Sequence, residues 1–214
     1  MKSFEFKLPL VYPITDTKIS GLSHTEQVRQ MIDGGAKLIQ LRSKDTPALD
    51  FFEDAKKAVE LAHLHEARII INDRVDIARL AGAAGVHVGQ EDLSPAAARR
   101  LLGDAAIIGL STHTIPQIEA ALAEPIDYLA VGPVFGTATK DTGYDAVGLT
   151  LVREAVRRAG SLPVVAIGGI TLENASSVID AGAASVAVIG DLLTGVDPEG
   201  RARAFLQRLV DNRL

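Results

Sequence analysis

The chain carries polar and cationic side chains at the end of one of its short apolar segments. Gln40, Arg42 and Lys44 occupy every second position around the end of the segment 38–42. Side chains of a strand alternate between its two faces, so we expect these three to share the inward face. A cation there is unfavourable unless a carboxylate or a bound anion neutralises it. A buried ion pair is the alternative, and we favour an anion-binding site.

Carboxylates follow two further apolar segments. Asp73 comes directly after the segment 68–72, and Asp92 comes shortly after the segment 85–88. On neighbouring units of one sheet, both carboxylates could reach a single hard cation. Mg²⁺ fits this pattern because it takes one or two carboxylates and completes its shell with water and phosphate oxygens. Either aspartate could instead cap the helix that follows it. We predict a Mg²⁺ site with Asp73 and Asp92 as ligands.

A hydroxyl-rich loop follows the apolar segment 126–131. Gly132 and Pro133 end that segment, and Thr137, Thr139 and Lys140 come soon after them. A buried strand that ends in small, hydroxyl and cationic residues is typical of a site at the carboxyl edge of a barrel or open sheet. The alternative is an ordinary polar loop.

Glycines follow the last two apolar segments. Gly168 and Gly169 follow the segment 163–167, and Gly190 follows the segment 185–189. Backbone N–H groups can approach an anion closely at glycine, and a short helix N-terminus assists them. After strands seven and eight of a barrel, this pattern predicts a phosphate site.

A serine and a histidine follow the segment 106–110. Ser111 is in phase with the inward positions of that segment, and His113 comes two residues later. A nucleophilic serine is not supported, because no acid stands at a suggestive spacing and no nucleophile elbow is present. We expect Ser111 to face the inside of the fold, and His87 to be a packed histidine there.

Eight short apolar segments recur, separated by helical patterns. They span residues 10–15, 38–42, 68–72, 85–88, 106–110, 126–131, 163–167 and 185–189. Eight strand-then-helix units in 214 residues are compact for a barrel but within its range. We therefore predict the α/β class, a (β/α)8 TIM barrel that forms a single domain over residues 1–214. A doubly wound open sheet is the main alternative.

Helix starts are marked by capping residues. Ser23 and Thr114 are each followed three positions later by a Glu or Gln, which predicts capping boxes. Thr46 and Ser94 each precede a proline, and Thr171 precedes another helical pattern. These caps predict where the helices between the strands begin.

Composition excludes several functional classes. The net charge is −5 without a basic run, and aromatic residues make up only 4%, so nucleic-acid binding is not expected. No apolar stretch is long enough to cross a membrane, and the N-terminus lacks a signal-peptide core. The absence of cysteine removes disulfides, thiolate metal sites and thiol nucleophiles, and fits a cytoplasmic protein.

Together these motifs resemble the thiamine-phosphate synthase (thiamine phosphate pyrophosphorylase) family, over nearly the whole chain. The resemblance is carried by QLRSK (40–44), IND (71–73), GVHVGQED (85–92), GLSTHT (109–114), DYLAVGPVFGTATK (127–140) and VVAIGGI (164–170). It implies coupling of hydroxymethylpyrimidine diphosphate to a thiazole phosphate, which gives thiamine monophosphate and pyrophosphate.

The resemblance also implies roles for individual residues. Gln40, Arg42, Lys44, Asn72 and Lys140 would bind the pyrimidine diphosphate, Asp73 and Asp92 would bind Mg²⁺, and Ser111 would contact the diphosphate. Thr137, Thr139, Gly168, Ile189 and Gly190 would bind the thiazole phosphate. Catalysis would fall to Arg42, Lys44, Ser111 and Lys140, which stabilise the departing pyrophosphate in a dissociative displacement.

Three positions depart from the family pattern. Ser43 replaces a charged residue, Gly136 replaces proline, and Gly190 stands where serine is usual. Loss of the serine hydroxyl puts affinity for the thiazole phosphate in doubt more than the reaction type. The alternatives are a thiazole tautomerase that uses His113 and a non-catalytic thiazole-phosphate-binding regulator. The expected partners are small molecules, and a homo-oligomer is possible.

Overall fold

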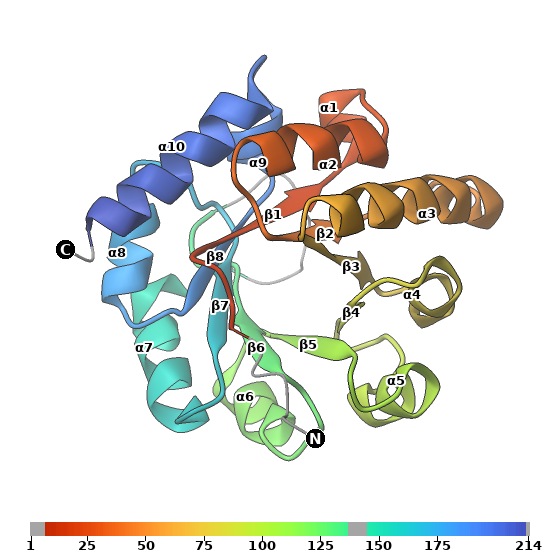
Figure 1. Ribbon diagram of the computed structural model, residues 1–214. Helices are drawn as coiled ribbons and strands as arrows, with labels where there is room; N and C mark the ends of the chain where they lie inside the picture. Colours follow the sequence, from red (N-terminus) through yellow and green to blue (C-terminus); the bar gives the residue numbers. More distant parts are fainter. Residues whose placement is uncertain (1–6, 137–144, 213–214) are drawn as a thin grey trace.

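The computed structural model describes residues 7–136 and 145–212, which form a (β/α)8 barrel. Eight parallel strands pair in chain order, and β8 pairs with β1 to close the barrel. Figure 1 shows the strands at the centre with the helices in a ring around them. The predicted TIM barrel is confirmed.

The strands agree closely with the expected apolar segments. They are β1 Val11–Thr15, β2 Leu38–Leu41, β3 Arg68–Asn72, β4 Gly85–Val88, β5 Ile107–Thr112, β6 Tyr128–Val131, β7 Val164–Ile167 and β8 Ser185–Val188. The sixth strand begins at Tyr128, later than expected. The backbone N–H of Asp127 donates to the carbonyl of Ile108 at 2.8 Å, and its carboxylate accepts from the N–H of Ile108 at 2.7 Å, so a side chain replaces one of the backbone partners there.

The helices cover the outside of the barrel. They are α1 Thr17–Ser20, α2 His24–Asp33, α3 Ala48–Leu64, α4 Val75–Ala81, α5 Pro95–Leu102, α6 Ile115–Ala121, α7 Gly148–Ala159, α8 Ala175–Asp180, α9 Gly190–Leu193 and α10 Pro198–Asp211. The last helix, α10, packs against both α2 and α8, so it joins the two ends of the chain around the barrel. This arrangement is visible in Figure 1.

Two of the predicted caps are confirmed in full. Ser23 accepts from the backbone N–H of Glu26, whose carboxylate accepts from Ser23 in return, so the capping box is complete. Ser94 caps α5 ahead of Pro95. Both helices therefore begin where the sequence predicted, because a side-chain oxygen satisfies an otherwise unpaired N–H.

The other predicted caps differ in detail. Thr114 caps α6, but the Gln117 amide oxygen accepts from the backbone N–H of His113, so the box is displaced by one residue. Helix α3 begins after Pro47, and Thr46 bonds to a neighbouring hydroxyl rather than to the helix. Helix α8 begins only at Ala175, after a turn that starts at Thr171.

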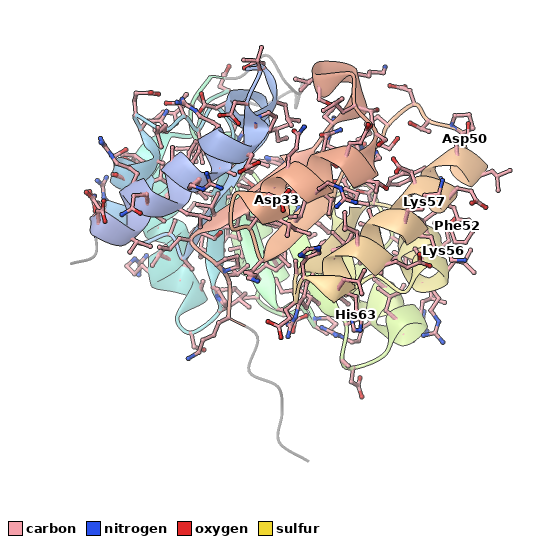
Figure 2. All side chains as sticks on the ribbon, turned by 45° about the horizontal axis from the view of Figure 1, so that its top comes forward. Asp33, Asp50, Phe52, Lys56, Lys57 and His63 are labelled. Carbon is pink, nitrogen blue, oxygen red and sulfur yellow. The ribbon has the colours of Figure 1, made fainter. Side chains whose placement is uncertain are left out.

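The core lies in two places, inside the barrel and between the strands and the helices. Nearly every strand residue is buried, as expected for parallel strands covered on both faces. Phe51, Ala55 and Ala58 of α3 are buried against the barrel. Figure 2 shows the opposite, solvent-facing side of α3 with Lys56 and His63 exposed. In the described part of the chain, no helix is long and apolar enough to span a membrane.

Candidate active site

Arg42 is paired with a carboxylate at the rim of the barrel. Strand β2 ends at Leu41, and Nη1 of Arg42 lies 2.5 Å from Oδ2 of Asp16, the residue that follows β1. Both side chains are largely buried, at 13% and 10% exposed. Asp16 also caps α1 by accepting from the N–H of Lys18 at 3.0 Å. The ion pair that was the alternative explanation for Arg42 is therefore present, and its carboxylate comes from a residue that we did not single out.

Of the three side chains that were expected to share the inward face, Gln40 lies within β2, whereas Arg42 and Lys44 come after the end of that strand. Gln40 is buried inside the barrel, whereas the side chain of Lys44 is 45% exposed. The difference arises because β2 ends before Arg42, so strand alternation no longer determines where the later side chains point.

Asp73 and Asp92 lie together, and Lys44 reaches them. The Lys44 ammonium forms an ion pair with Asp73. Burial raises the pKa of Asp92 above its ordinary value, and the neighbouring Asp73 raises it further. Asp92 also accepts from the backbone N–H of Gly89 at 2.7 Å, which holds its carboxylate beside β4.

Asp73 has an unusual backbone conformation. Its φ of 62° is in the left-handed region, which aspartate tolerates better than most residues. Its N–H donates to the carbonyl of His87 at 2.8 Å, so the turn after β3 is tied to β4. The backbone thus holds the Asp73 carboxylate near Asp92, and backbone strain of this kind is found disproportionately at functional sites.

The Asp73–Asp92 pair is suited to Mg²⁺, which binds to few protein ligands, and less suited to a metal whose ligands all come from the protein. No group of three or more histidine, aspartate or glutamate side chains gathers as a metal site among the described residues. Two carboxylates leave several positions for water and phosphate oxygens, which Mg²⁺ prefers. The mutual repulsion that raises the pKa of Asp92 is also what a divalent cation would relieve.

Across the rim, a cavity of about 250 Å³ lies at the ends of β5 to β8. It is lined by Ser111, His113, Gly132, Pro133, Ile167, Gly168, Gly169, Ile170, Thr171, Ala187, Ile189, Gly190, Asp191 and Thr194. The predicted Ser111, Gly168, Ile189 and Gly190 thus share one cavity. The glycine backbone and the start of α9 supply N–H groups of the kind that donate hydrogen bonds to a phosphate.

Gly168 and Gly169 are required by close backbone contacts. Both have positive φ, and a Cβ on Gly168 would lie 2.5 Å from Cα of Pro133. A Cβ on Gly169 would lie 2.5 Å from the carbonyl oxygen of Gly136. The loop after β6 therefore rests directly on the loop after β7. Thr137, Thr139 and Lys140 follow Gly136 in the chain and lie outside the described residues.

An acid in the cavity wall is neutralised by an arginine that the sequence analysis missed. Asp191 of α9 accepts from Nε and Nη2 of Arg201 at 3.0 and 2.9 Å. Asp191 also accepts from the N–H of Leu172, in the segment that follows β7, at 3.1 Å. The carboxylate thus ties two sides of the cavity together while Arg201 removes its net charge. No local motif indicates this pair, because the two residues come from different helices.

Ser111 and Asn72 occupy the remaining part of the rim. Asn72 ends β3 and is buried, with its strand position paired to His87. Ser111 of β5 lines the cavity. Its hydroxyl oxygen lies 2.8 Å from Nε2 of His87. His87 is buried as predicted. Its Nδ1 lies 2.9 Å from the hydroxyl of Tyr128, another residue that we did not single out.

His113 also lies in the cavity wall. Its Nδ1 donates to the carbonyl of Gly132 at 2.5 Å, which fixes the ring plane. Its backbone N–H donates to Gln117. The residue named for the alternative tautomerase activity is therefore positioned at the cavity rather than away from it.

Comparisons with known proteins agree with this geometry. A family model described as thiamine monophosphate synthase matches residues 11–192. The chain is 46% identical over 208 residues to the thiamine-phosphate synthase of Koribacter versatilis, covering 95% of this chain and 97% of that protein. It is 42% identical over 203 residues to the thiamine-phosphate synthase of Methanospirillum hungatei, covering 94% and 97%.

A solved structure gives the same result. The thiamine phosphate pyrophosphorylase from Pyrococcus furiosus superposes with a TM-score of 0.86 at 31% identity, covering 94% of this chain and 96% of that one. The residues that the family model matches include the carboxylate pair, the cations that follow β2 and most of the cavity wall. The chain is therefore an enzyme of the transferase class and belongs to the thiamine monophosphate synthase family.

Proposed function

We propose that this enzyme couples a pyrimidine diphosphate to a thiazole phosphate and releases pyrophosphate, with Mg²⁺ as its cofactor. One observation carries the proposal: a cluster of charged side chains and a glycine-rich cavity share one end of the barrel. Residues after β1 to β4 form a charged cluster around Asp73 and Asp92, whereas β6 to β8 bound a glycine-rich cavity. Ser111 on β5 lies between these two halves of the rim.

The charged cluster suits a diphosphate only together with a metal. Arg42 is balanced by Asp16, and Lys44 is balanced by Asp73, so the described cluster offers little net positive charge. When bound, Mg²⁺ would supply the positive charge that a departing pyrophosphate requires. Arg42 and Lys44 then orient the diphosphate oxygens by hydrogen bonds, because their own positions are fixed by the carboxylates beside them.

The cavity suits the phosphate of the second substrate. Backbone N–H groups near Gly168 and at the start of α9 would donate hydrogen bonds to its oxygens. Ile167 and Ile189 supply apolar surface for the thiazole ring. The thiazole nitrogen needs no general base to attack, so positioning against the pyrimidine carbon is the main task of this wall.

Lys140, which lies outside the described residues, is also proposed to bind the diphosphate. The family resemblance gives it a contact with the diphosphate. One well-placed charge in an active site is worth about 3–4 kcal/mol of transition-state stabilisation. We therefore expect Lys140→Ala to lower turnover at least about tenfold, and a smaller loss would count heavily against the dissociative mechanism.

The deciding experiment is formation of thiamine monophosphate from the two substrates, with Mg²⁺ and with EDTA. We expect product only with the metal. No product under either condition, while the thiazole phosphate still binds, would exclude the synthase reaction. His113 in the cavity wall would then make the tautomerase the reaction to assay next.

A further inference from the structure

Five polar side chains form a continuous hydrogen-bonded series through the inside of the barrel. We call it the interior chain, and it consists of Gln40 (β2), Tyr12 (β1), Tyr128 (β6), His87 (β4) and Ser111 (β5). Its successive heavy-atom distances are 3.1, 3.0, 2.9 and 2.8 Å. All of its members except Ser111, which faces the cavity, are buried.

The direction of the first link is fixed by chemistry. Nε2 of Gln40 is an amide nitrogen and can only donate, so the hydroxyl of Tyr12 accepts from it. The Tyr12 hydrogen then needs an acceptor. Among the described residues, the Tyr128 hydroxyl is the only other group that contacts it. Tyr12 therefore donates to Tyr128.

The remaining links are consistent with the same direction. The Tyr128 oxygen accepts from Tyr12, and Nδ1 of His87 lies 2.9 Å from that hydroxyl, where it can accept the Tyr128 hydrogen. A neutral imidazole with an accepting Nδ1 carries its hydrogen on Nε2. That hydrogen is donated to the Ser111 hydroxyl. The serine oxygen thus accepts from inside the barrel, and its hydrogen is left for the cavity.

Both phenols retain the hydrogens that this scheme needs. Burial raises the pKa of Tyr12 above its ordinary value, and burial raises that of Tyr128 as well. The ring of His87 is stacked on that of Tyr128 at a centroid distance of 5.5 Å, which restricts rotation of the imidazole.

We propose that the interior chain has this single direction and that it holds the Ser111 hydroxyl as a hydrogen-bond donor to an anionic oxygen of the substrate. The role at the substrate rests on the proposed function. Tyr128 and His87 are then positioning residues, since they act on the substrate only through Ser111. A serine held as a donor suits a phosphate or diphosphate oxygen, which can only accept at neutral pH.

The first test is the tautomer of His87 in the substrate-free protein, read from the ¹⁵N shifts of labelled histidine and assigned with His87→Gln. We expect hydrogen on Nε2. Tyr128→Phe removes the donor to Nδ1 and should change the ¹⁵N shift of Nδ1, which loses that hydrogen bond. Tyr12→Phe is the matched control, because it deletes one buried hydroxyl yet leaves Tyr128 able to donate to His87.

The second test is a double-mutant cycle with Ser111→Ala. We expect Tyr128→Phe to lower kcat/KM about three- to tenfold in the wild-type background, the effect of one misdirected hydrogen bond. In the Ser111→Ala background it should cause no further loss. A change that merely disturbed the barrel would lower activity equally in both backgrounds.

Three outcomes would overturn the proposal: a wild-type His87 with hydrogen on Nδ1, an unchanged Nδ1 shift in Tyr128→Phe, or equal losses in both backgrounds. Should Tyr128→Phe not fold, Gln40→Glu decides the direction, because a carboxylate would accept from Tyr12 and move the His87 hydrogen to Nδ1. If wild-type protein shows no coupling activity, the proposed function fails, while the tautomer still decides the direction of the interior chain.

Discussion

Gly109 and Tyr128 are paired across β5 and β6, and the glycine leaves the space that the tyrosine ring occupies. A Cβ on Gly109 would lie 2.0 Å from Cζ of Tyr128. The same ring lies edge-on to Tyr12 at a centroid distance of 5.9 Å and is fully buried. The missing side chain of Gly109 is thus a condition for the interior chain.

Gly109→Ala should therefore destabilise the fold by displacing the Tyr128 ring. Overpacking of this kind costs about 1–3 kcal/mol. Urea unfolding would measure the change in the free energy of unfolding. Gly195→Ala is the matched control, because nothing lies within 4 Å of a Cβ at Gly195. Adding Tyr128→Leu to Gly109→Ala should recover part of the loss, and no recovery would show that the clash lies elsewhere.

Asp73→Asn and Asp92→Asn should each weaken Mg²⁺ binding. Asparagine keeps the shape and one acceptor oxygen, so Asp92→Asn can retain the hydrogen bond from Gly89 while the charge is lost. We expect the Mg²⁺ concentration for half-maximal activity to rise about tenfold or more. The control is Asp50→Asn on the exposed face of α3, labelled in Figure 2. Unchanged Mg²⁺ dependence in both site variants would remove these residues from the metal site.

Arg201→Gln should weaken binding of the thiazole phosphate. Without Arg201, no cation would neutralise the carboxylate of Asp191 in the cavity wall, and its negative charge would repel the phosphate. We expect the KM for that substrate to rise about tenfold, roughly 1.4 kcal/mol, with kcat little changed. Arg203→Gln, which removes an exposed pair with Glu199, is the control.

The double variant Arg201→Gln/Asp191→Asn separates charge from structure. If the unpaired negative charge weakens binding, removing it should restore part of the affinity. If Arg201 acts only by holding the segment around Leu172, the double variant should bind no better than Arg201→Gln. Isothermal titration calorimetry with the thiazole phosphate would measure the affinity of both variants.

His24 should make the stability of the fold depend on pH. The side chain is buried, Nδ1 lies 2.6 Å from the Thr15 hydroxyl, and Nε2 has no hydrogen-bond partner among the described residues. Burial lowers its pKa from 6.5, although Asp54 and Asp16 oppose the shift. The unfolded chain therefore binds the proton more readily than the folded one.

The resulting stabilisation is complete above the unfolded pKa and is lost as the pH falls below 6.5. The slope from one such group approaches about 1.4 kcal/mol per pH unit. Urea unfolding between pH 7 and pH 5 on wild type and His24→Asn would test this. The variant should show a shallower dependence, and equal slopes would assign the effect to other groups.

The local sequence determined the order and type of most elements. Apolar segments such as Arg68–Asn72 and Gly85–Val88 have the bounds expected from their composition, because both faces of a parallel strand are buried. Capping residues such as Ser23 predicted where helices begin, because a capping side chain bonds to an N–H only a few residues away. The sequence also identified the carboxylate pair and the glycines of the cavity, because each follows a strand whose end lies on the same rim.

Only the tertiary structure decided which side chains meet across the barrel. Lys44 comes after the end of β2, where strand alternation no longer applies, and it pairs with Asp73. Arg42 pairs with Asp16, which follows another strand. The interior chain joins Tyr12 and Tyr128, which are 116 residues apart in the sequence. Such contacts depend on closure of the barrel, and no local pattern encodes them. The sequence placed the charged groups at one rim, and barrel closure determined how they pair and which polar side chains meet beneath them.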